Sequence, residues 1–415
     1  MNDIEVYVEL KGKPILAGIL FTHGEGRREL SFFNYDQNYL ATPGAYALEP
    51  AMPLKLGNYS FSEGLPKSFL DASPDNWGRA LIERGLQKDW VLSGTPSNHI
   101  TEMDYLMETS DMTRQGALRF KFGNEEDFEA SGTDVPKLLT LPALLDAAQK
   151  ICSEEGVAND YQAVRTLLDA GSGSLGGARP KSSVIEVDAQ GREILYLAKF
   201  PHPKDSYDVM RWEKIALELA SLAGIETPDN RLICIDGANV LLLRRFDRTD
   251  EGYRIGYMSA LTLLQTDMRR ASDYLQIADE LTEISGGVSD DLAQLWRRIV
   301  FSYAINNTDD HLRNHGLLRH KNSWRLSPAF DINADMALEK SHVTAIGGAD
   351  TYTDAWAMIH QSYDRFRLKE KDATKIMAEV GSAFSQWRAT AHKYDATDDE
   401  LRRFAPIFER AMSGF

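Results

Sequence analysis

Alternating hydrophobic and polar positions near the start of the chain predict a small β-rich subdomain. Residues 4–10 alternate in the run IEVYVEL, and a Gly-Lys-Pro turn then leads into the apolar run ILAGILF. Two further runs, LSFFNYDQNYL and YALEPAMPLKL, predict strands that are interrupted by proline and glycine. A helix is expected to begin near Asp75, behind a Ser-Pro start signal, and to stop at Gly85. The run GALRFKF then predicts a strand that leaves the subdomain.

The middle of the chain predicts two helices, a β-hairpin, a third helix and a second hairpin. An acidic stretch at 124–136, closed by proline, is interpreted as a linker. PALLDAAQKI and NDYQAVRTLLDA have helical spacing. SSVIEVD and REILYLAKF alternate on either side of a turn-like Asp-Ala-Gln-Gly and predict a hairpin whose second strand ends at Lys199. The helical run VMRWEKIALELASLAGI and the hairpin-like RLICIDGANVLLLRRFDR follow.

The last third is predicted to be mostly helical. A helix-like apolar run stops at Asn306, a hairpin-like segment follows, and Asp331 is expected at the end of an apolar strand-like run. Between 340 and 415, three amphipathic segments predict a helical bundle, with Trp387, Phe404 and Phe408 in its core. The pattern as a whole indicates an α+β protein.

Composition narrows the class of protein. With 43% hydrophobic and 26% charged residues among 415, the chain has the balance of a globular protein with two or three cores. Its apolar runs are too short to cross a bilayer, and its acidic opening residues do not resemble a signal peptide, so a cytoplasmic location is expected. Two cysteines predict no disulfide framework. The net charge of -16 argues against strong unaided binding to DNA or anionic lipid.

A glycine-rich run follows the second helix of the middle region. Gly171, Gly173 and Gly176 form G-x-G-x-x-G, but a helix precedes it and a strand follows, the reverse of a dinucleotide-binding loop. A Walker loop fails because no Gly-Lys-Ser/Thr closes the run. A loop that covers phosphates beneath a β-hairpin remains. Lys199 would then hold the nucleotide phosphates and Glu213 would pair with it. The alternatives are a snorkelling strand-end lysine and a solvated surface glutamate.

Asp309 and Asn314 form a D-x4-N spacing that suits phosphoryl transfer. The Asp orients or deprotonates the acceptor hydroxyl, while the Asn and a later Asp, Asp331, hold the magnesium ions that bridge the nucleotide phosphates. The alternative is an ordinary loop whose polar residues cap and turn the backbone. Metal-dependent hydrolysis by the crowded Asp and His side chains at 309–320 is disfavoured, because no glutamate base lies nearby. The order of glycine loop, strand lysine, helix glutamate, hinge, D-x4-N and Asp indicates a kinase-type catalytic domain.

Several segments resemble one known family. SLGGARPKSSV, LAKFP, LLLRRFDR, TDDHLRNHG and LSPAFD are similar to the signature segments of HipA-type serine/threonine kinases, the toxins of bacterial type II toxin–antitoxin systems. SFLDASPDNWGR and GALRF resemble the N-terminal subdomain of that family. The resemblance implies a protein-kinase-like, two-lobed catalytic domain with a small β-rich N-terminal subdomain and a helical C-terminal lobe. On this basis we expect an N-terminal subdomain at 1–123, a linker at 124–136, a nucleotide-binding lobe at 137–246 and a helical catalytic lobe at 247–415.

The same resemblance implies a set of site residues. Asp309 would be the catalytic base, Asn314 and Asp331 would bind Mg²⁺, and Lys199 would contact the phosphates of ATP. The further nucleotide-binding positions are the loop Ser174, Leu175, Gly176, Gly177 and Ala178, the hinge Arg244, Arg245 and Phe246, and His311, which we expect to hydrogen-bond the catalytic loop.

Autophosphorylation is expected at Ser174, with Ser172 as a second candidate. A phosphate there would add about two negative charges where the nucleotide phosphates bind, and would inactivate the enzyme. Two departures from the family pattern are Trp212, where relatives usually carry Asn, and Arg244, where they commonly carry an acidic residue.

The family further implies a protein substrate, in some members an aminoacyl-tRNA synthetase, whose phosphorylation stops translation and leads to growth arrest and persistence. It also implies a HipB-like helix-turn-helix antitoxin that binds operator DNA. The rival interpretations are a lipid or small-molecule phosphotransferase, since both use a related D-x4-N, and a non-catalytic corepressor subunit of the antitoxin. No membrane partner is expected, because neither a basic docking face nor an amphipathic anchor is evident.

Overall fold

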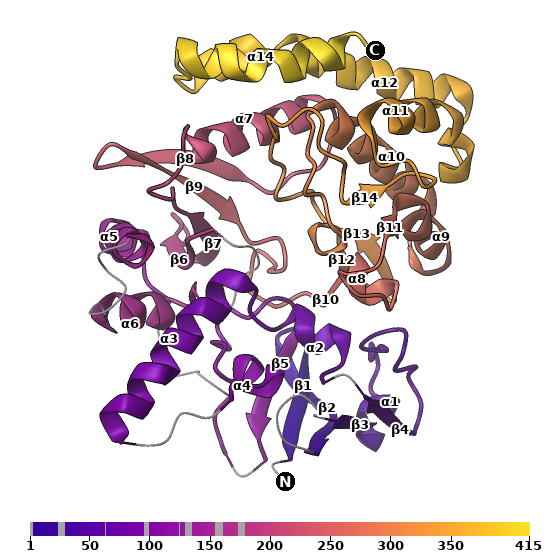
Figure 1. Cartoon of the computed structure of the whole chain (residues 1–415). Coiled ribbons are helices and arrows are strands. Elements are labelled where there is room, and N and C mark those ends of the chain that lie inside the picture. The colour runs from indigo at the N-terminus through magenta and orange to yellow at the C-terminus, as the bar shows by residue number, and fades with distance from the viewer. Residues whose placement is uncertain are drawn as a thin grey trace. The chain divides into compact units, whose positions relative to one another are not determined.

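The computed structural model describes residues 3–23, 30–62, 64–94, 99–123, 125–128, 135–153, 161–172 and 179–415. The chain packs as two compact units (Figure 1). Unit 1 comprises Met1–Asp205 and Ile233–Met258, and unit 2 comprises Ser206–Leu232 and Ser259–Phe415. The units are defined by packing, and the domain boundaries expected from the sequence stay predictions. Within the described residues, no helix combines the length and apolar character needed to span a membrane.

An antiparallel sheet of five strands forms the N-terminal part of unit 1. Its strand order is β4-β3-β2-β1-β5, and the strands are β1 (Ile4–Leu10), β2 (Lys13–His23), β3 (Leu30–Tyr35), β4 (Asn58–Phe61) and β5 (Leu118–Phe122). Alternate residues of β1 are buried, as the sequence pattern predicted. The strand predicted over 46–56 is wrong. That segment forms turns, because Pro50 and Pro53 cannot donate hydrogen bonds to a strand ladder.

Among the described residues of unit 1, the α-helices are α1 (Gln37–Ala41), α2 (Lys67–Asp71), α3 (Asn76–Ser93), α4 (Glu102–Met107), α5 (Leu141–Cys152) and α6 (Tyr161–Asp169). Helix α3 begins at Asp75, whose side chain accepts a hydrogen bond from the Asn76 N–H, as predicted. The predicted stop at Gly85 is wrong. A Cβ at Gly85 would lie 2.9 Å from Leu168 of α6, so this glycine allows two helices to pack closely, and α3 continues to the left-handed Gly94.

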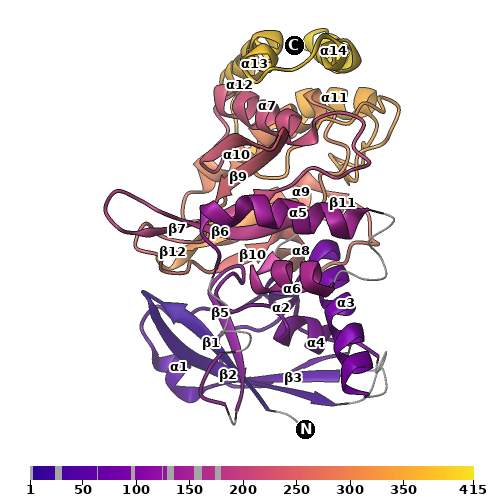
Figure 2. The same cartoon turned by 90° about the vertical axis from the view of Figure 1, so that its left-hand side faces the viewer.

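A second antiparallel sheet contains both predicted hairpins. Its order is β6-β7-β9-β8, with β6 (Lys181–Val187), β7 (Glu193–Lys199), β8 (Asn230–Ile235) and β9 (Ala238–Arg244). The β6–β7 register runs from Val187↔Glu193 to Lys181↔Lys199. Helices α5 and α6 lie beside β6 (Figure 2). They share a core with Trp77 and Phe200, so the region around the glycine-rich run is built on the same apolar cluster as α3.

Unit 2 is mainly helical. Its helices are α7 (Val209–Leu222), α8 (Ala260–Leu263), α9 (Tyr274–Ile284), α10 (Val288–Ala304), α11 (Tyr352–Gln361), α12 (Glu370–Ser385), α13 (Trp387–Lys393) and α14 (Asp398–Met412). Its strands are the antiparallel hairpin β12 (Gly316–His320) and β13 (Ser323–Leu326) and the short parallel pair β11 (Ser272–Asp273) and β14 (Thr344–Ala345). Strand β10 (Tyr257–Ser259) lies where the chain passes from unit 1 to unit 2.

The predicted aromatic core of unit 2 is confirmed. Trp387 stacks on Phe408 with ring centroids 4.4 Å apart, and Phe404 stacks on Trp212 of α7. All four side chains are buried. These contacts join α7, α13 and α14 into one layer. Helix α10 ends, as predicted, immediately before the D-x4-N loop.

Candidate active site

The loop that follows α10 carries the candidate catalytic residues of unit 2. Asn306 has a φ of 60°, a left-handed conformation that Asn tolerates and that ends the helix. The backbone carbonyl of Asp309 accepts hydrogen bonds from the His311 N–H at 2.9 Å and from the Asn314 side-chain nitrogen at 3.3 Å. A 3₁₀ turn at Leu312–Asn314 closes the segment. The chain therefore turns back between Asp309 and Asn314, and the Asn314 amide contacts the Asp309 carbonyl.

The two adjacent aspartates of this loop have opposite environments. Asp309 is exposed, whereas Asp310 is buried. The Asp310 carboxylate accepts hydrogen bonds from Tyr274 at 2.6 Å and Ser302 at 2.9 Å, and it lies 3.0 Å from the His315 Nε2. Burial raises the pKa of Asp310, but His315 and these hydrogen bonds outweigh burial and lower the pKa to about 2. Asp310 therefore holds the loop, and Asp309 is the carboxylate that can meet a substrate.

Asp331 lies in a second loop that is fastened to the first. It has a φ of 57° and follows an irregular segment, so the strand expected to end there is wrong; β13 stops at Leu326. The Asn333 side-chain nitrogen donates to the Asp331 carboxylate at 3.3 Å, and the Asn333 N–H donates to the Asn307 side chain at 3.4 Å. Asn333 thus connects the Asp331 loop to the D-x4-N loop. No sequence pattern singled out Asn333, although Asn so close to an Asp is common in turns.

Asp335 forms a second hydrogen-bonded link between the same two loops. Its carboxylate accepts a hydrogen bond from Thr308 at 2.6 Å, and its N–H donates to the Asn306 carbonyl at 3.0 Å. Burial raises the pKa of Asp335, but hydrogen bonds from Thr308 and its other neighbours leave it lowered. The carboxylate is therefore ionised and structural at neutral pH.

The donor types of the two loops fit a magnesium–nucleotide complex. Asn314 supplies an amide oxygen and Asp331 a carboxylate oxygen, the hard ligands that Mg²⁺ accepts when phosphates and water complete its shell. In the part of the chain that the structure describes, no group of three or more His, Cys, Asp or Glu side chains is placed to hold a metal by itself.

The predicted nucleotide-binding residues of unit 1 are only partly described. Ser174, Leu175, Gly176, Gly177 and Ala178 lie outside the described residues. Lys199 ends β7 as predicted, and its side chain is buried, opposite Lys181 on β6.

The described residues at the entry to the glycine-rich run are tightly packed. Ser172 is fully buried, so its phosphorylation would require this segment to leave its position. Gly171 has a φ of 69°, and a Cβ there would lie 2.4 Å from the Thr113 hydroxyl oxygen. Thr113 therefore packs directly against the start of the run.

The predicted hinge residues serve the packing of unit 1. Arg244 pairs with Tyr196 in the β7–β9 ladder, and the Arg245 N–H donates to the Leu195 carbonyl at 2.9 Å. The Arg245 guanidinium contacts both carboxylate oxygens of Asp247, at 2.7 and 2.6 Å, and donates to the Thr113 carbonyl at 2.9 Å. The role of these backbone groups in binding adenine stays a prediction, and the Arg245 amide is already engaged in the sheet.

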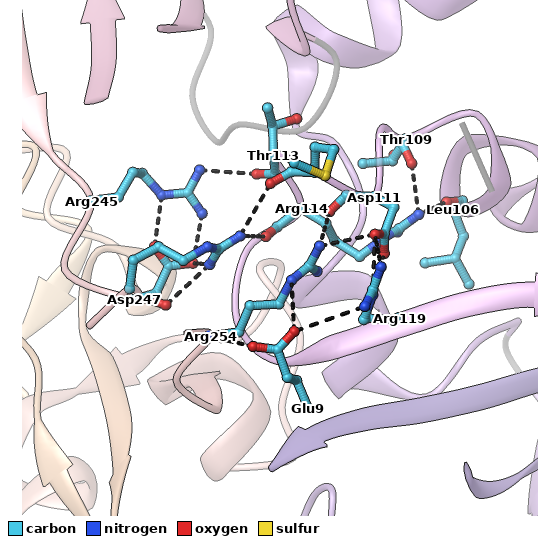
Figure 3. Close-up of polar contacts among 12 residues, drawn as sticks. Glu9, Leu106, Thr109, Asp111, Thr113, Arg114, Arg119, Arg245, Asp247 and Arg254 are labelled. Carbon is cyan, nitrogen blue, oxygen red and sulfur yellow. Dashed lines mark hydrogen bonds and ion pairs between the residues drawn. The ribbon is translucent and has the colours of Figure 1, made fainter. Parts of the chain in front are cut away.

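Two buried carboxylates, Asp111 and Asp247, organise a cluster of arginines in unit 1 (Figure 3). Asp111 pairs with Arg119 at 2.6 Å and with Arg254 at 3.0 Å. Asp247 pairs with Arg245 at 2.6 Å and with Arg248 at 2.8 Å. We call these six residues the arginine cluster. It joins segments more than 100 positions apart in the sequence, and no local pattern pointed to it.

Glu213 and Trp212 of α7 are both buried. The alternative of a solvated surface glutamate is therefore wrong. The pairing of Glu213 with Lys199 stays a prediction. Trp212, the departure from the family pattern, has a structural role, because it stacks on Phe404.

His342 gives unit 2 a pH-dependent stability. The ring is buried and stacks on Tyr303 with centroids 4.0 Å apart. Burial lowers the pKa of His342 to about 4 from its ordinary 6.5, although the nearby Asp310 acts in the opposite direction. Between those values the unfolded chain binds a proton that the folded chain does not, so stability falls as pH falls through this window.

As pH falls from about 7.5 to about 4.5, the wild type should lose about 2 kcal/mol of its free energy of unfolding through His342, and His342→Phe should be spared this loss. The measurement is the free energy of unfolding in urea at both pH values, for the wild type and the variant. A variant that loses as much stability as the wild type would show that another group titrates in this window.

Comparisons with known proteins identify the family. Residues 8–120 match the family model of the HipA N-terminal domain, and residues 173–387, just over half of the chain, match that of the HipA-like C-terminal domain. The chain therefore belongs to the HipA family. The β-rich N-terminal region and the helical C-terminal part are those predicted for this family.

Three proteins illustrate what the chain is similar to. "Putative kinase Y4dM" of Sinorhizobium fredii is 26% identical over 37% of this chain, and a "Putative kinase" of Haemophilus influenzae is 24% identical over 38%. These matches span 40% and 51% of the length of those relatives. The HipA, HipB and operator DNA complex of the toxin–antitoxin system of Shewanella oneidensis MR-1 contains a chain with a TM-score of 0.69 and 12% identity, over 99% of this chain and 96% of that one. That likeness shows a shared fold.

Proposed function

We propose that this protein is an ATP- and Mg²⁺-dependent serine/threonine protein kinase of a toxin–antitoxin pair. The observation that carries the proposal is the D-x4-N loop, where Asp309 is exposed and Asp310 is buried. The Asn314 amide donates to the Asp309 carbonyl, and Asn333 links Asp331 to Asn307, two positions before Asp309. An exposed carboxylate suits a base that meets the acceptor hydroxyl. The family membership and the kinase descriptions of the two relatives support the same conclusion.

The proposed residues have separate tasks. Asp309 would orient the acceptor hydroxyl and receive its proton, while Asn314 and Asp331 would bind the Mg²⁺ that accompanies ATP. Lys199 and the loop from Ser174 to Ala178 would contact the phosphates. Mg²⁺ would neutralise charge that develops between the phosphates. The buried Asp310, with Tyr274 and Ser302, would keep Asp309 in place without touching substrate.

The substrate and the partners are proposed from the family to which the chain belongs. We propose a translation-related protein as substrate, with an aminoacyl-tRNA synthetase as the first candidate, and autophosphorylation of the glycine-rich loop as the route to inactivation. A HipB-like helix-turn-helix antitoxin would supply most of the DNA contact, in keeping with the acidic chain. The Shewanella structure contains such a HipA, HipB and operator DNA assembly.

The experiment compares wild type with Asp309→Asn in cells and in purified form. Phosphoproteomics should show serine phosphorylation that depends on Asp309, and purified wild type with ATP and Mg²⁺ should gain one phosphate, on Ser174 or Ser172. We expect Asp309→Asn to lower the rate of transfer at least about 10²-fold. Asp290→Asn, an exposed carboxylate on α10, is the matched control and should leave the rate unchanged.

Other outcomes would replace the proposal. Labelled phosphate found on lipid or on a small molecule would indicate a different phosphotransferase. Growth arrest that is unchanged in Asp309→Asn would indicate the non-catalytic corepressor. An unmodified mass after prolonged incubation with ATP would exclude autoregulation through the loop.

A further inference from the structure

The last helix of the chain reaches the candidate catalytic loop through one side chain. Arg410 of α14 donates from Nη2 to the side-chain oxygen of Asn306 at 2.7 Å and from Nη1 to the Leu338 carbonyl at 2.8 Å. Its guanidinium also lies 3.8 Å from the ring centroid of Tyr352. Helix α14 lies beyond residue 387, where the match to the HipA-like C-terminal domain ends, so the family model says nothing about this contact.

Asn306 is the residue at which the two candidate loops meet. It is fully buried, and its side-chain nitrogen donates to the Asp335 carbonyl at 2.5 Å and to the Ala337 carbonyl at 3.3 Å. Its backbone carbonyl accepts hydrogen bonds from the N–H groups of Asp335 and Thr308, both at 3.0 Å. The side-chain oxygen is then left for Arg410. Asn306 thus uses both ends of its amide, one toward the Asp335 segment and one toward α14.

The geometry also explains why an arginine is suited to this position. Asn306 has a φ of 60°, a left-handed conformation that Asn tolerates, and hydrogen bonds at both ends of its side-chain amide hold the residue in place. A planar guanidinium can donate to the Asn306 oxygen and the Leu338 carbonyl at once while stacking on Tyr352, and a lysine cannot do all three. Leu338 lies three positions after Asp335, so Arg410 contacts both sides of the junction between the loops.

We propose that Arg410 is a positioning residue that fixes the separation of the Asp309–Asn314 loop and the Asp331–Asp335 loop. This inference rests on the proposed function, because it is the phosphoryl-transfer site whose geometry Arg410 would hold. The role proposed for Arg410 is indirect and includes no contact with substrate or metal. It acts through Asn306, whose neighbours Thr308 and Asp335 carry the constraint to the two loops.

The test compares Arg410→Met with Arg403→Met, which changes the same residue type on the same helix. Arg403 donates to Ser206 and lies over Tyr207, away from the catalytic loop. We expect Arg410→Met to lower kcat by about 10- to 100-fold and to raise the Mg²⁺ concentration at half-maximal activity, because a displacement of about 1 Å has effects of this size. Arg410→Lys should recover part of the activity. Arg403→Met should change kcat and the Mg²⁺ requirement less than about twofold.

A second measurement does not depend on activity. Hydrogen exchange of the backbone amides at 306–311 and 333–337 should be faster in Arg410→Met than in wild type, and unchanged in Arg403→Met. If these amides exchange at the wild-type rate in Arg410→Met, the inference is overturned whether or not the protein transfers phosphate. If exchange is faster but the wild type transfers no phosphate from ATP, Arg410 positions the loops and the proposed function fails instead. Equal kinetic losses in both variants would indicate a general effect of α14 and would also overturn the inference.

Discussion

Asp310→Ala is expected to lower the free energy of unfolding by about 3–5 kcal/mol, because the change removes a buried charge that several groups share. Tyr274 and Ser302 would lose their acceptor, and His315 would lose the carboxylate 3.0 Å from its Nε2. The Asp310 carbonyl also accepts from Thr344 at 2.6 Å, which joins the loop to β14, so loosening here should extend to that strand. Urea unfolding of the purified variant measures the loss.

The neighbouring Asp309 provides the control for this prediction. Asp309 is exposed, so Asp309→Ala should change the free energy of unfolding by less than about 0.5 kcal/mol while abolishing activity. The two variants should therefore separate stability from catalysis at adjacent positions. Asp310 has a folded pKa of about 2, below its ordinary 3.8, so its contribution is present above pH 3.8 and is lost as pH falls toward 2. Equal stability of the two variants at neutral pH would contradict the assignment of their roles.

Local sequence patterns predicted most of the elements around the site. The alternation in SSVIEVD and REILYLAKF predicted β6 and β7 with Lys199 at the strand end, and the apolar run before Asn306 predicted the end of α10. These features depend on neighbours within a few residues, which a single sequence displays directly. The D-x4-N spacing belongs to the same class, because the turn that brings Asn314 to Asp309 is local.

Features that depend on distant partners were not predictable in this way. Gly85 was predicted to end a helix. It is a glycine because Leu168 of another helix lies too close for a Cβ, and the local sequence does not show that neighbour. No local pattern indicated that Asp310 is buried while Asp309 is exposed, since the hydrogen-bond partners of Asp310 come from α9, α10 and His315. Arg245 was interpreted through its backbone as a hinge residue, whereas its side chain takes part in the arginine cluster. The contacts of Gly85 with Leu168, of Asp310 with Tyr274 and of Arg245 with Thr113 join residues at least 36 positions apart in the sequence, and local periodicity carries no record of them.

The arginine cluster supplies the second large prediction, because Asp247 is a buried carboxylate that pairs with two guanidinium groups. Two guanidinium groups and the Gly116 N–H, at 2.8 Å, surround Asp247. Burial raises the pKa of Asp247, but Arg245 and Arg248 outweigh burial and hold the pKa far below its usual range. Asp247→Ala would leave both guanidinium groups buried without this partner, and we expect it to lower the free energy of unfolding of unit 1 by about 3–5 kcal/mol.

Asp250→Ala is the matched control for Asp247→Ala. Its carboxylate pairs with Arg244 at the surface and is 63% exposed, so this change should cost less than about 1 kcal/mol. Urea unfolding of both variants gives the comparison, and hydrogen exchange locates the change. Because Arg248 also donates to the Arg114 carbonyl at 2.9 Å and Arg245 to the Thr113 carbonyl at 2.9 Å, protection should be lost in the segment at 109–116 as well as at 245–254. Loss confined to 245–254 would mean that Asp247 supports only its own segment, and that other contacts, such as the Asp111–Arg254 ion pair, hold the N-terminal residues to it.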